Sequence, residues 1–126
     1  MIKARFETTQ DQKSFVLTIS GHAGQAEAGK DLICASATIL AYTAAQIVSE
    51  LYADGKLKKK PAVTLNEGNA VITCKPRKDA YAKALQTFLT VQAGFALLAH
   101  HYPEYVQITR FDRESVPVDI EKNRSL

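Results

Sequence analysis

The chain has 126 residues, of which 46% are hydrophobic and 23% are charged, and its net charge is +3 at pH 7. This composition is typical of one globular domain with a single core, and it excludes a disordered or low-complexity chain. The net charge is too small to indicate a nucleic-acid-binding protein by itself.

The N-terminal residues lack the apolar segment of a secretory signal, and no apolar run approaches the roughly 18 residues of a membrane span. We therefore expect one cytoplasmic domain over residues 1–126, with a loose polar tail at about 113–126. The two cysteines, Cys34 and Cys74, are expected to be reduced, because disulfides are rare in that compartment.

Two segments near the N-terminus alternate between apolar and polar side chains. Residues 2–8 and 15–19 both show the period of two that is typical of a half-buried strand. The polar stretch TTQDQKS between them has the length and composition of a hairpin connection. The two segments are predicted to pair as antiparallel strands.

The pattern then changes to helical spacing, from Leu32 to about Tyr52. Asp31 is predicted to be the N-cap of this helix. No charged residue occurs between Leu32 and Ser49, so the helix is expected to be covered on several sides, either at the centre of the domain or at a subunit interface. Its predicted apolar stripe consists of Ile33, Leu40, Ala44, Ile47 and Leu51.

The rest of the chain predicts a second hairpin, a second helix and a last strand. The hairpin covers residues 62–75, with its turn at Glu67 to Asn69, the helix covers residues 79–101, and the strand covers residues 105–111. The element order is ββαββαβ. It predicts an α+β fold in which two helices pack on a mainly antiparallel five-stranded sheet, with the strand order left open.

Cys34 falls at the start of the first helix. With Asp31 as N-cap it is the third helical residue, where free N–H groups and the helix dipole favour a thiolate, although the charge of Asp31 opposes this. On a helical wheel it lies about 120° from Leu40, away from the predicted stripe. A small buried hydrophobe remains the structural alternative.

His22 follows the second strand, directly after Gly21, and eleven residues separate it from Cys34. Gly24 and Gly29 give the intervening loop the freedom to fold back. A histidine beside a thiol is the minimum for activating a cysteine nucleophile, since imidazole can take the proton and later return it. A solvated surface histidine is the alternative that the spacing leaves open.

The other sequence features are given a structural interpretation and no catalytic or ligand-binding role. No CxxC or HxxxH pair and no phosphate-binding glycine motif occurs, so neither a metal nor another cofactor is expected. The lysine cluster from Lys56 to Lys60 is interpreted as a solvated loop. The aromatic residues Tyr42, Tyr52 and Phe95 could line a pocket, but they are assigned to the core.

The stretch GHAGQAEAGKDLICASAT resembles the signature of the bacterial ribosomal-processing cysteine proteases, the Prp or YsxB-like family. In that family a Gly-His-Ala element is followed by Gly-x-Asp-(Ile/Leu)-(Val/Ile)-Cys-Ala. Ser36 stands where many members have Ala or Gly. The matching residues are Gly21, His22, Ala23, Gly29, Asp31, Leu32, Ile33, Cys34 and Ala35.

The resemblance implies a cysteine endopeptidase that removes the N-terminal extension of a large-subunit ribosomal protein, cutting just after an aromatic-containing motif, and that forms a homodimer. Cys34 would be the nucleophile and His22 its general base and acid, with no third catalytic residue assigned. The loop from Ala23 to Lys30 would be a mobile cover over the peptide. The substrate would lie against Gly21, Ala23, Gly24, Gly29 and Asp31.

The resemblance gives no cofactor, membrane contact or direct nucleic-acid partner. Two alternatives stay open. One is a noncatalytic ribosome- or RNA-associated module that uses the Lys56 to Lys60 cluster, whose binding should weaken steeply with salt. The other is a redox protein that uses Cys34, which is less favoured because no second cysteine lies near it in the sequence.

Overall fold

The computed structural model describes residues 1–9, 11, 13–22 and 28–111. Its elements follow the predicted order ββαββαβ, so the α+β class is confirmed. A single turn of 3-10 helix, Lys78–Ala80, precedes the second helix, and the predicted tail at about 113–126 lies outside the described residues. The elements are strands β1 (Ile2–Thr8), β2 (Phe15–Ser20), β3 (Val63–Asn66), β4 (Asn69–Cys74) and β5 (Val106–Thr109), with helices α1 (Ala28–Ala53) and α2 (Tyr81–His101).

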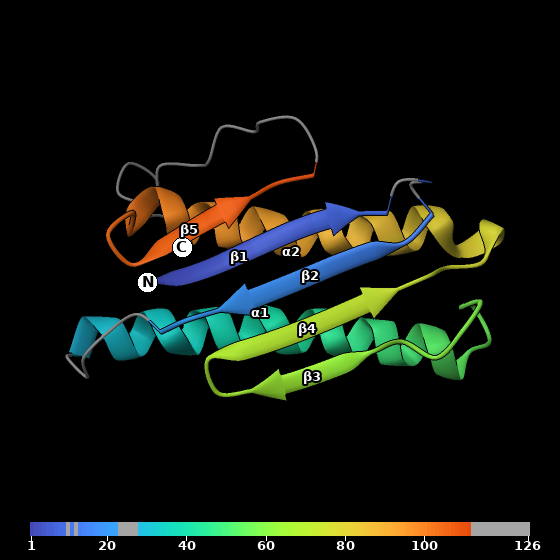
Figure 1. The fold of residues 1–126 in the computed structure, drawn as a ribbon, viewed down its shortest axis with the longest axis horizontal. Coiled ribbons are helices and arrows are strands. Elements are labelled where there is room, and N and C mark those ends of the chain that lie inside the picture. The colour runs from blue at the N-terminus through green and yellow to red at the C-terminus, as the bar shows by residue number, and fades with distance from the viewer. Residues whose placement is uncertain (10, 12, 23–27, 112–126) are drawn as a thin grey trace, which may run out of the picture.

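The five strands form one sheet in the order β3-β4-β2-β1-β5 (Figure 1). The pairs β1–β2, β2–β4 and β3–β4 are antiparallel, as predicted, whereas β1 and β5 are parallel. The sheet is therefore mixed. The parallel pair arises because α2 carries the chain back along the sheet before β5 begins, as crossover connections do.

Both helices cover one face of the sheet (Figure 1). The core lies between the helices and this face. Alternate side chains of β1, β2 and β4 are buried on this face, whereas Lys3, Arg5 and Glu7 are exposed on the other. Stacked and edge-on aromatic pairs join the sheet to α2: the ring centroids of Phe15 and Phe88 are 5.3 Å apart, and those of Phe6 and Phe95 are 5.9 Å apart. The alternation seen in the sequence is thus the alternation of burial.

Helix α1 packs mainly through small residues, most of which the predicted apolar stripe did not include. Leu40 and Ile47 are only half-buried, and both pack against the core. A Cβ atom at Gly94 of α2 would lie 2.5 Å from Cδ2 of Leu40, which shows how close the two helices approach. The buried residues of α1 are Ile33, Ala37, Ala41, Ala44, Ala45, Val48 and Leu51.

Helix α1 begins at Ala28, one turn before the predicted start, so Asp31 is not its N-cap. Alanine and lysine are good helix formers, and one glycine costs a helix only about 1 kcal/mol relative to alanine. The sequence Ala28-Gly29-Lys30 therefore extends the helix instead of ending the loop. Gly29 and Lys30, predicted to belong to a mobile cover, are helical.

The segment Leu32–Ala53 is long and apolar enough, by length and composition alone, to cross a membrane, with a mean hydropathy of 1.6. The expectation that no apolar run reaches that length was wrong. One third of this segment is buried inside the molecule. Its other face carries exposed apolar side chains, among them Leu32, Ile39 and Tyr42. The composition of α1 thus reflects packing on one side and an uncovered apolar surface on the other.

Candidate active site

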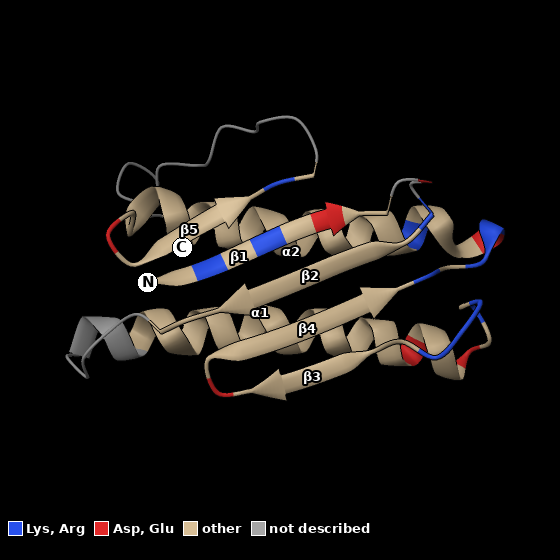
Figure 2. Cartoon of the chain, viewed as in Figure 1, with Lys and Arg blue, Asp and Glu red and all other residues tan. Residues whose placement is uncertain are grey.

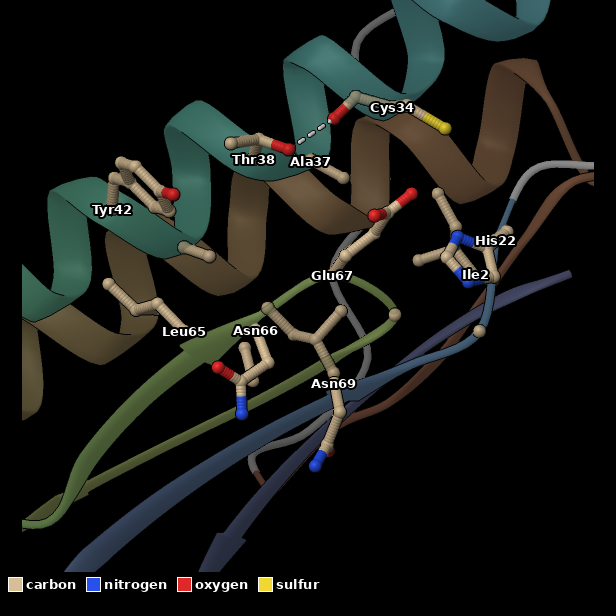
Figure 3. A pocket seen from close by; sticks show the side chains of 15 residues that line it. Ile2, His22, Cys34, Ala37, Thr38, Tyr42, Leu65, Asn66, Glu67 and Asn69 are labelled. Atoms are coloured by element: carbon tan, nitrogen blue, oxygen red, sulfur yellow. Dashed lines mark hydrogen bonds between the residues drawn. The ribbon is translucent and has the colours of Figure 1, made fainter. Parts of the chain in front are cut away.

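A pocket of about 400 Å³ lies at one end of the sheet, between α1, the end of β2 and the turn that joins β3 to β4 (Figure 3). It brings together residues that are far apart in the sequence. Its walls are apolar where the core side chains approach and polar at the turn. The lining residues are Ile2, Ile19, Gly21, His22, Cys34, Ala37, Thr38, Ala41, Tyr42, Leu65, Asn66, Glu67, Gly68, Asn69 and Ala70.

His22 stands at the rim of this pocket because the backbone at the end of β2 is held on two sides. The Gly21 N–H donates to the carbonyl oxygen of Gly68 at 3.0 Å, and the amino group of Met1 donates to the carbonyl oxygen of His22. Gly21 has a φ of 89°, and a Cβ atom there would lie 2.1 Å from the Met1 carbonyl oxygen. Only glycine therefore fits the residue that presents His22.

The imidazole of His22 rests against Gly68 in the β3–β4 turn. Asn66 pairs with Asn69, so the turn itself consists of Glu67 and Gly68, and Gly68 has a φ of 75°. A Cβ atom at Gly68 would lie 2.6 Å from Nε2 of His22 and 2.9 Å from Cε1. The backbone of the turn thus packs directly against the ring, and a side chain at Gly68 would clash with it. This is a second reason for glycine at this position, besides its positive φ.

Cys34 enters the pocket from α1, where it is half-buried and packs against the core. Its sulfur leaves the helix on the side where His22 lies (Figure 3). Cys34 is the seventh residue of α1 rather than the third, so its N–H belongs to the regular helical ladder. The free N–H groups of the helix start lie about one turn earlier, which removes the expected contact of Cys34 with those groups and with the positive end of the helix dipole.

The other cysteine, Cys74 on β4, is buried in the core with only 1% of its surface exposed. This burial raises the pKa of its thiol from 9.0 to about 11, since an apolar environment disfavours the charged thiolate. The folded state holds the proton more tightly than the unfolded state. The resulting contribution to stability is present below about pH 9 and is lost as the pH rises through about 11.

The sequence matches the family model of the cysteine protease Prp over residues 1–107. The chain belongs to the Prp family of cysteine proteases. This assignment confirms the resemblance and the prediction of a cysteine protease. A comparison with curated proteins found no significant match.

Solved structures show the Prp fold. A ribosomal processing protease Prp from S. aureus, in complex with a covalently linked product peptide, is 17% identical with a TM-score of 0.61, covering 86% of this chain and 98% of that one. The same enzyme with a substrate peptide is 16% identical, with the same TM-score and coverage. SMU.848 from Streptococcus mutans is 22% identical with a TM-score of 0.61, covering 86% and 92%. At these identities the likeness concerns the fold.

The predicted site residues of this Prp protein fall into three groups. Gly21, His22 and Cys34 line the same pocket. Gly29 and Asp31 lie in the first turn of α1, not in a loop. Ala23 and Gly24, which were also predicted to contact substrate, lie outside the described residues.

Sequence reasoning missed the contribution of the β3–β4 turn to the pocket. Glu67 rises from this turn toward α1 (Figure 3), and it is the one carboxylate among the described residues that line the pocket. Tyr42, assigned to the core, is 51% exposed and lines the pocket instead, whereas Phe95 is fully buried as expected. The described residues contain no group of three His, Cys, Asp or Glu side chains that could hold a metal ion.

The two thiols should differ sharply in alkylation. At pH 8, a thiol with a pKa of about 11 is about one part in 1,000 thiolate, and Cys74 is buried as well. We expect iodoacetamide to add one label, at Cys34, as measured by intact mass spectrometry. The second label should appear only in denaturant, and equal labelling of both thiols under native conditions would contradict this assignment.

Proposed function

We propose that this Prp protein is a cytoplasmic cysteine endopeptidase that removes the N-terminal extension of a large-subunit ribosomal protein, with Cys34 as nucleophile and His22 as general base and acid. The observation that carries the proposal is that these two side chains, from α1 and from the end of β2, line one pocket of about 400 Å³. The S. aureus structures, described as a ribosomal processing protease with bound peptides, support the substrate class.

The chemistry follows from the two side chains. His22 takes the proton of the Cys34 thiol, and the thiolate attacks the scissile carbonyl carbon to form a tetrahedral intermediate. Collapse of this intermediate breaks the C–N bond, and the His22 imidazolium gives its proton to the leaving amine. Water, activated by His22, then attacks the thioester and releases the second product with a free Cys34 thiol.

The walls of the pocket suit a peptide with large apolar side chains next to the cut. Ile2, Ile19 and Leu65 form an apolar floor, and the Tyr42 ring stands at the side. Aromatic pairs prefer edge-on or offset contacts, which the exposed Tyr42 ring can offer to an aromatic residue of the substrate. This fits cleavage just after an aromatic-containing motif.

The test of this function is incubation of the protein with the extended ribosomal protein, followed by mass spectrometry. We expect a single cut within the extension and no cut in the same protein after its extension is removed. A precursor that stays intact, while a generic peptide is cleaved, would overturn the proposed substrate and leave the protease assignment standing.

We propose in addition that the protein is a homodimer. The outer face of α1 is apolar and uncovered in the single chain: Leu32 is 70% exposed and Ile39 is 63% exposed. A groove of about 430 Å³ continues this face between α1 and α2, past Gly94 and Leu97 to Tyr102. Exposed apolar patches of this kind mark interfaces in soluble proteins, and a two-fold axis would cover both copies at once.

The dimer is tested by sedimentation of Ile39→Asp against Val63→Asp. Both changes place a carboxylate at an exposed apolar position, but Val63 lies on the edge strand β3, away from the helical face. We expect the Ile39 variant to sediment as a monomer and the Val63 variant to sediment as a dimer. Dimers in both variants would exclude the α1 face as the interface.

A further inference from the structure

The fold gathers positive charge at the end of the molecule that is far from the pocket. The loop after α1 and the segment after β4 are joined there: Leu57 forms an isolated bridge with Pro76, the Lys58 N–H donates to the Lys75 carbonyl oxygen, and the Arg77 N–H donates to the Lys56 carbonyl oxygen, both at 2.8 Å. The lysine cluster of the sequence thereby gains three more cations. We call this group the basic end, and its members are Lys56, Lys58, Lys59, Lys60, Lys75, Arg77 and Lys78 (Figure 2).

Little of this charge is neutralised within the described residues. Lys56 forms an ion pair with Asp79 at 3.2 Å, and the ion pairs of the described residues include no other member of the basic end. Apart from the half-buried Lys75, all its members are exposed. Asp11 adds negative charge within electrostatic reach of Lys75, and Asp54 lies two residues before Lys56 in the sequence, but a clear excess of cations remains. Charges arranged in this way concentrate counter-ions and attract extended anions.

An exposed aromatic residue precedes these cations in the chain. Tyr52, in the last turn of α1, is 44% exposed, and it precedes the basic loop by four residues. The sequence assigned Tyr52 to the core, whereas the structure exposes it at the end of α1 from which the basic loop starts. Proteins that bind single-stranded nucleic acids combine a cationic track for the backbone with aromatic side chains on which bases stack.

We propose that the basic end, together with Tyr52, binds the phosphodiester backbone of single-stranded nucleic acid and leaves the pocket at the other end of the sheet free. Lysines act as mobile point charges toward phosphates and read no sequence, so the binding is independent of base identity. The sequence alone favoured a solvated loop, because Lys75, Arg77 and Lys78 are remote from the lysine cluster until β4 returns to it. This proposal does not depend on the peptide substrate.

The expected signature is salt dependence. If about five of the seven cations each neutralise one phosphate, log K falls with log salt at a slope of about −3.5, from about −0.7 for each phosphate of a single strand. Between 50 and 200 mM salt the affinity should then fall by about 100-fold. RNA and DNA strands of one sequence share this phosphate chemistry, and comparing them shows whether the 2′-hydroxyl contributes.

The experiment is fluorescence anisotropy with labelled single strands of about 20 nucleotides, one RNA and one DNA, over this salt range. The test variant is Lys59→Gln with Lys60→Gln, and the matched control is Lys3→Gln with Arg5→Gln on the solvent face of β1, which loses the same charge. We expect the test variant to reduce the slope by about 1.4 and Tyr52→Ala to weaken binding, while the control variant binds as the unmodified protein does.

The outcomes separate this proposal from the proposed protease function. Peptide cleavage should be unchanged in both double variants, because neither touches the pocket. No binding at 50 mM salt, or equal losses in the test and control variants, would overturn the proposal. Tighter binding to vesicles with anionic lipid than to either strand, with the same dependence on Lys59 and Lys60, would overturn it in favour of a membrane surface.

Discussion

Replacing Cys34 by alanine should abolish peptide cleavage and leave the fold intact. In the proposed mechanism the sulfur forms the acyl-enzyme, and nothing else among the described residues of the pocket carries a thiol. Removing a nucleophile of this kind lowers kcat by a factor on the order of 10³ or more. His22→Ala should lower kcat/KM by about 10² to 10⁴, the usual contribution of a general base. The measurement is kcat/KM on a fluorogenic peptide that spans the cut.

Cys74→Ala is the matched control, because it removes the other thiol. Cys74 lies in the core, so its loss should cost about 1 kcal/mol of stability through a small cavity, with cleavage unchanged. The double variant Cys34→Ala with His22→Ala should be no slower than Cys34→Ala alone, since the two side chains act as one unit. Cleavage at an undiminished rate in Cys34→Ala would refute the assignment of the nucleophile.

The local elements, and the placing of His22 and Cys34 at one pocket, could be predicted from the sequence because their signals are local. Alternation in β1, β2 and β4 sets which face is buried, and the pairing of Val63 with Ile72 and of Leu65 with Ala70 follows from the turn between them. His22 and Cys34 lie eleven residues apart in one segment, so the Gly-His-Ala and Asp-Leu-Ile-Cys pattern could identify both. Neither inference required the strand order.

The parts that sequence reasoning missed depend on contacts between distant segments. The β3–β4 turn reaches His22 only because β4 lies next to β2, with Ser20 opposite Asn69. Glu67 and Gly68 were therefore placed correctly in a turn, but without any link to the site. The stripe predicted for α1 was incomplete because a helical wheel emphasises large residues: Ala37, Ala41 and Ala45 are buried, whereas the large Leu40 is half-buried and contacts Gly94 of α2.

Gly68 is the other position where a small change should have a large effect. An alanine there places its Cβ atom within 2.6 Å of the His22 ring and keeps a φ of 75°. The ring must move, and displacement of a catalytic group by about 1 Å can cost about 100-fold in rate. We expect Gly68→Ala to lower kcat by about this factor with a smaller effect on KM, as measured by steady-state cleavage of the same peptide.

Gly55 provides the control, since it has a φ of 71° and a Cβ atom there would meet no atom of the described residues within 4 Å. Gly55→Ala carries the same backbone strain, about 1 kcal/mol, without displacing a side chain. It should therefore lose stability and keep its activity. In a His22→Ala background the clash disappears, so Gly68→Ala should then cost no further activity and no more stability than Gly55→Ala does. If Gly68→Ala instead slows the His22→Ala enzyme as much as it slows the unmodified one, the turn acts on the reaction by a route other than His22.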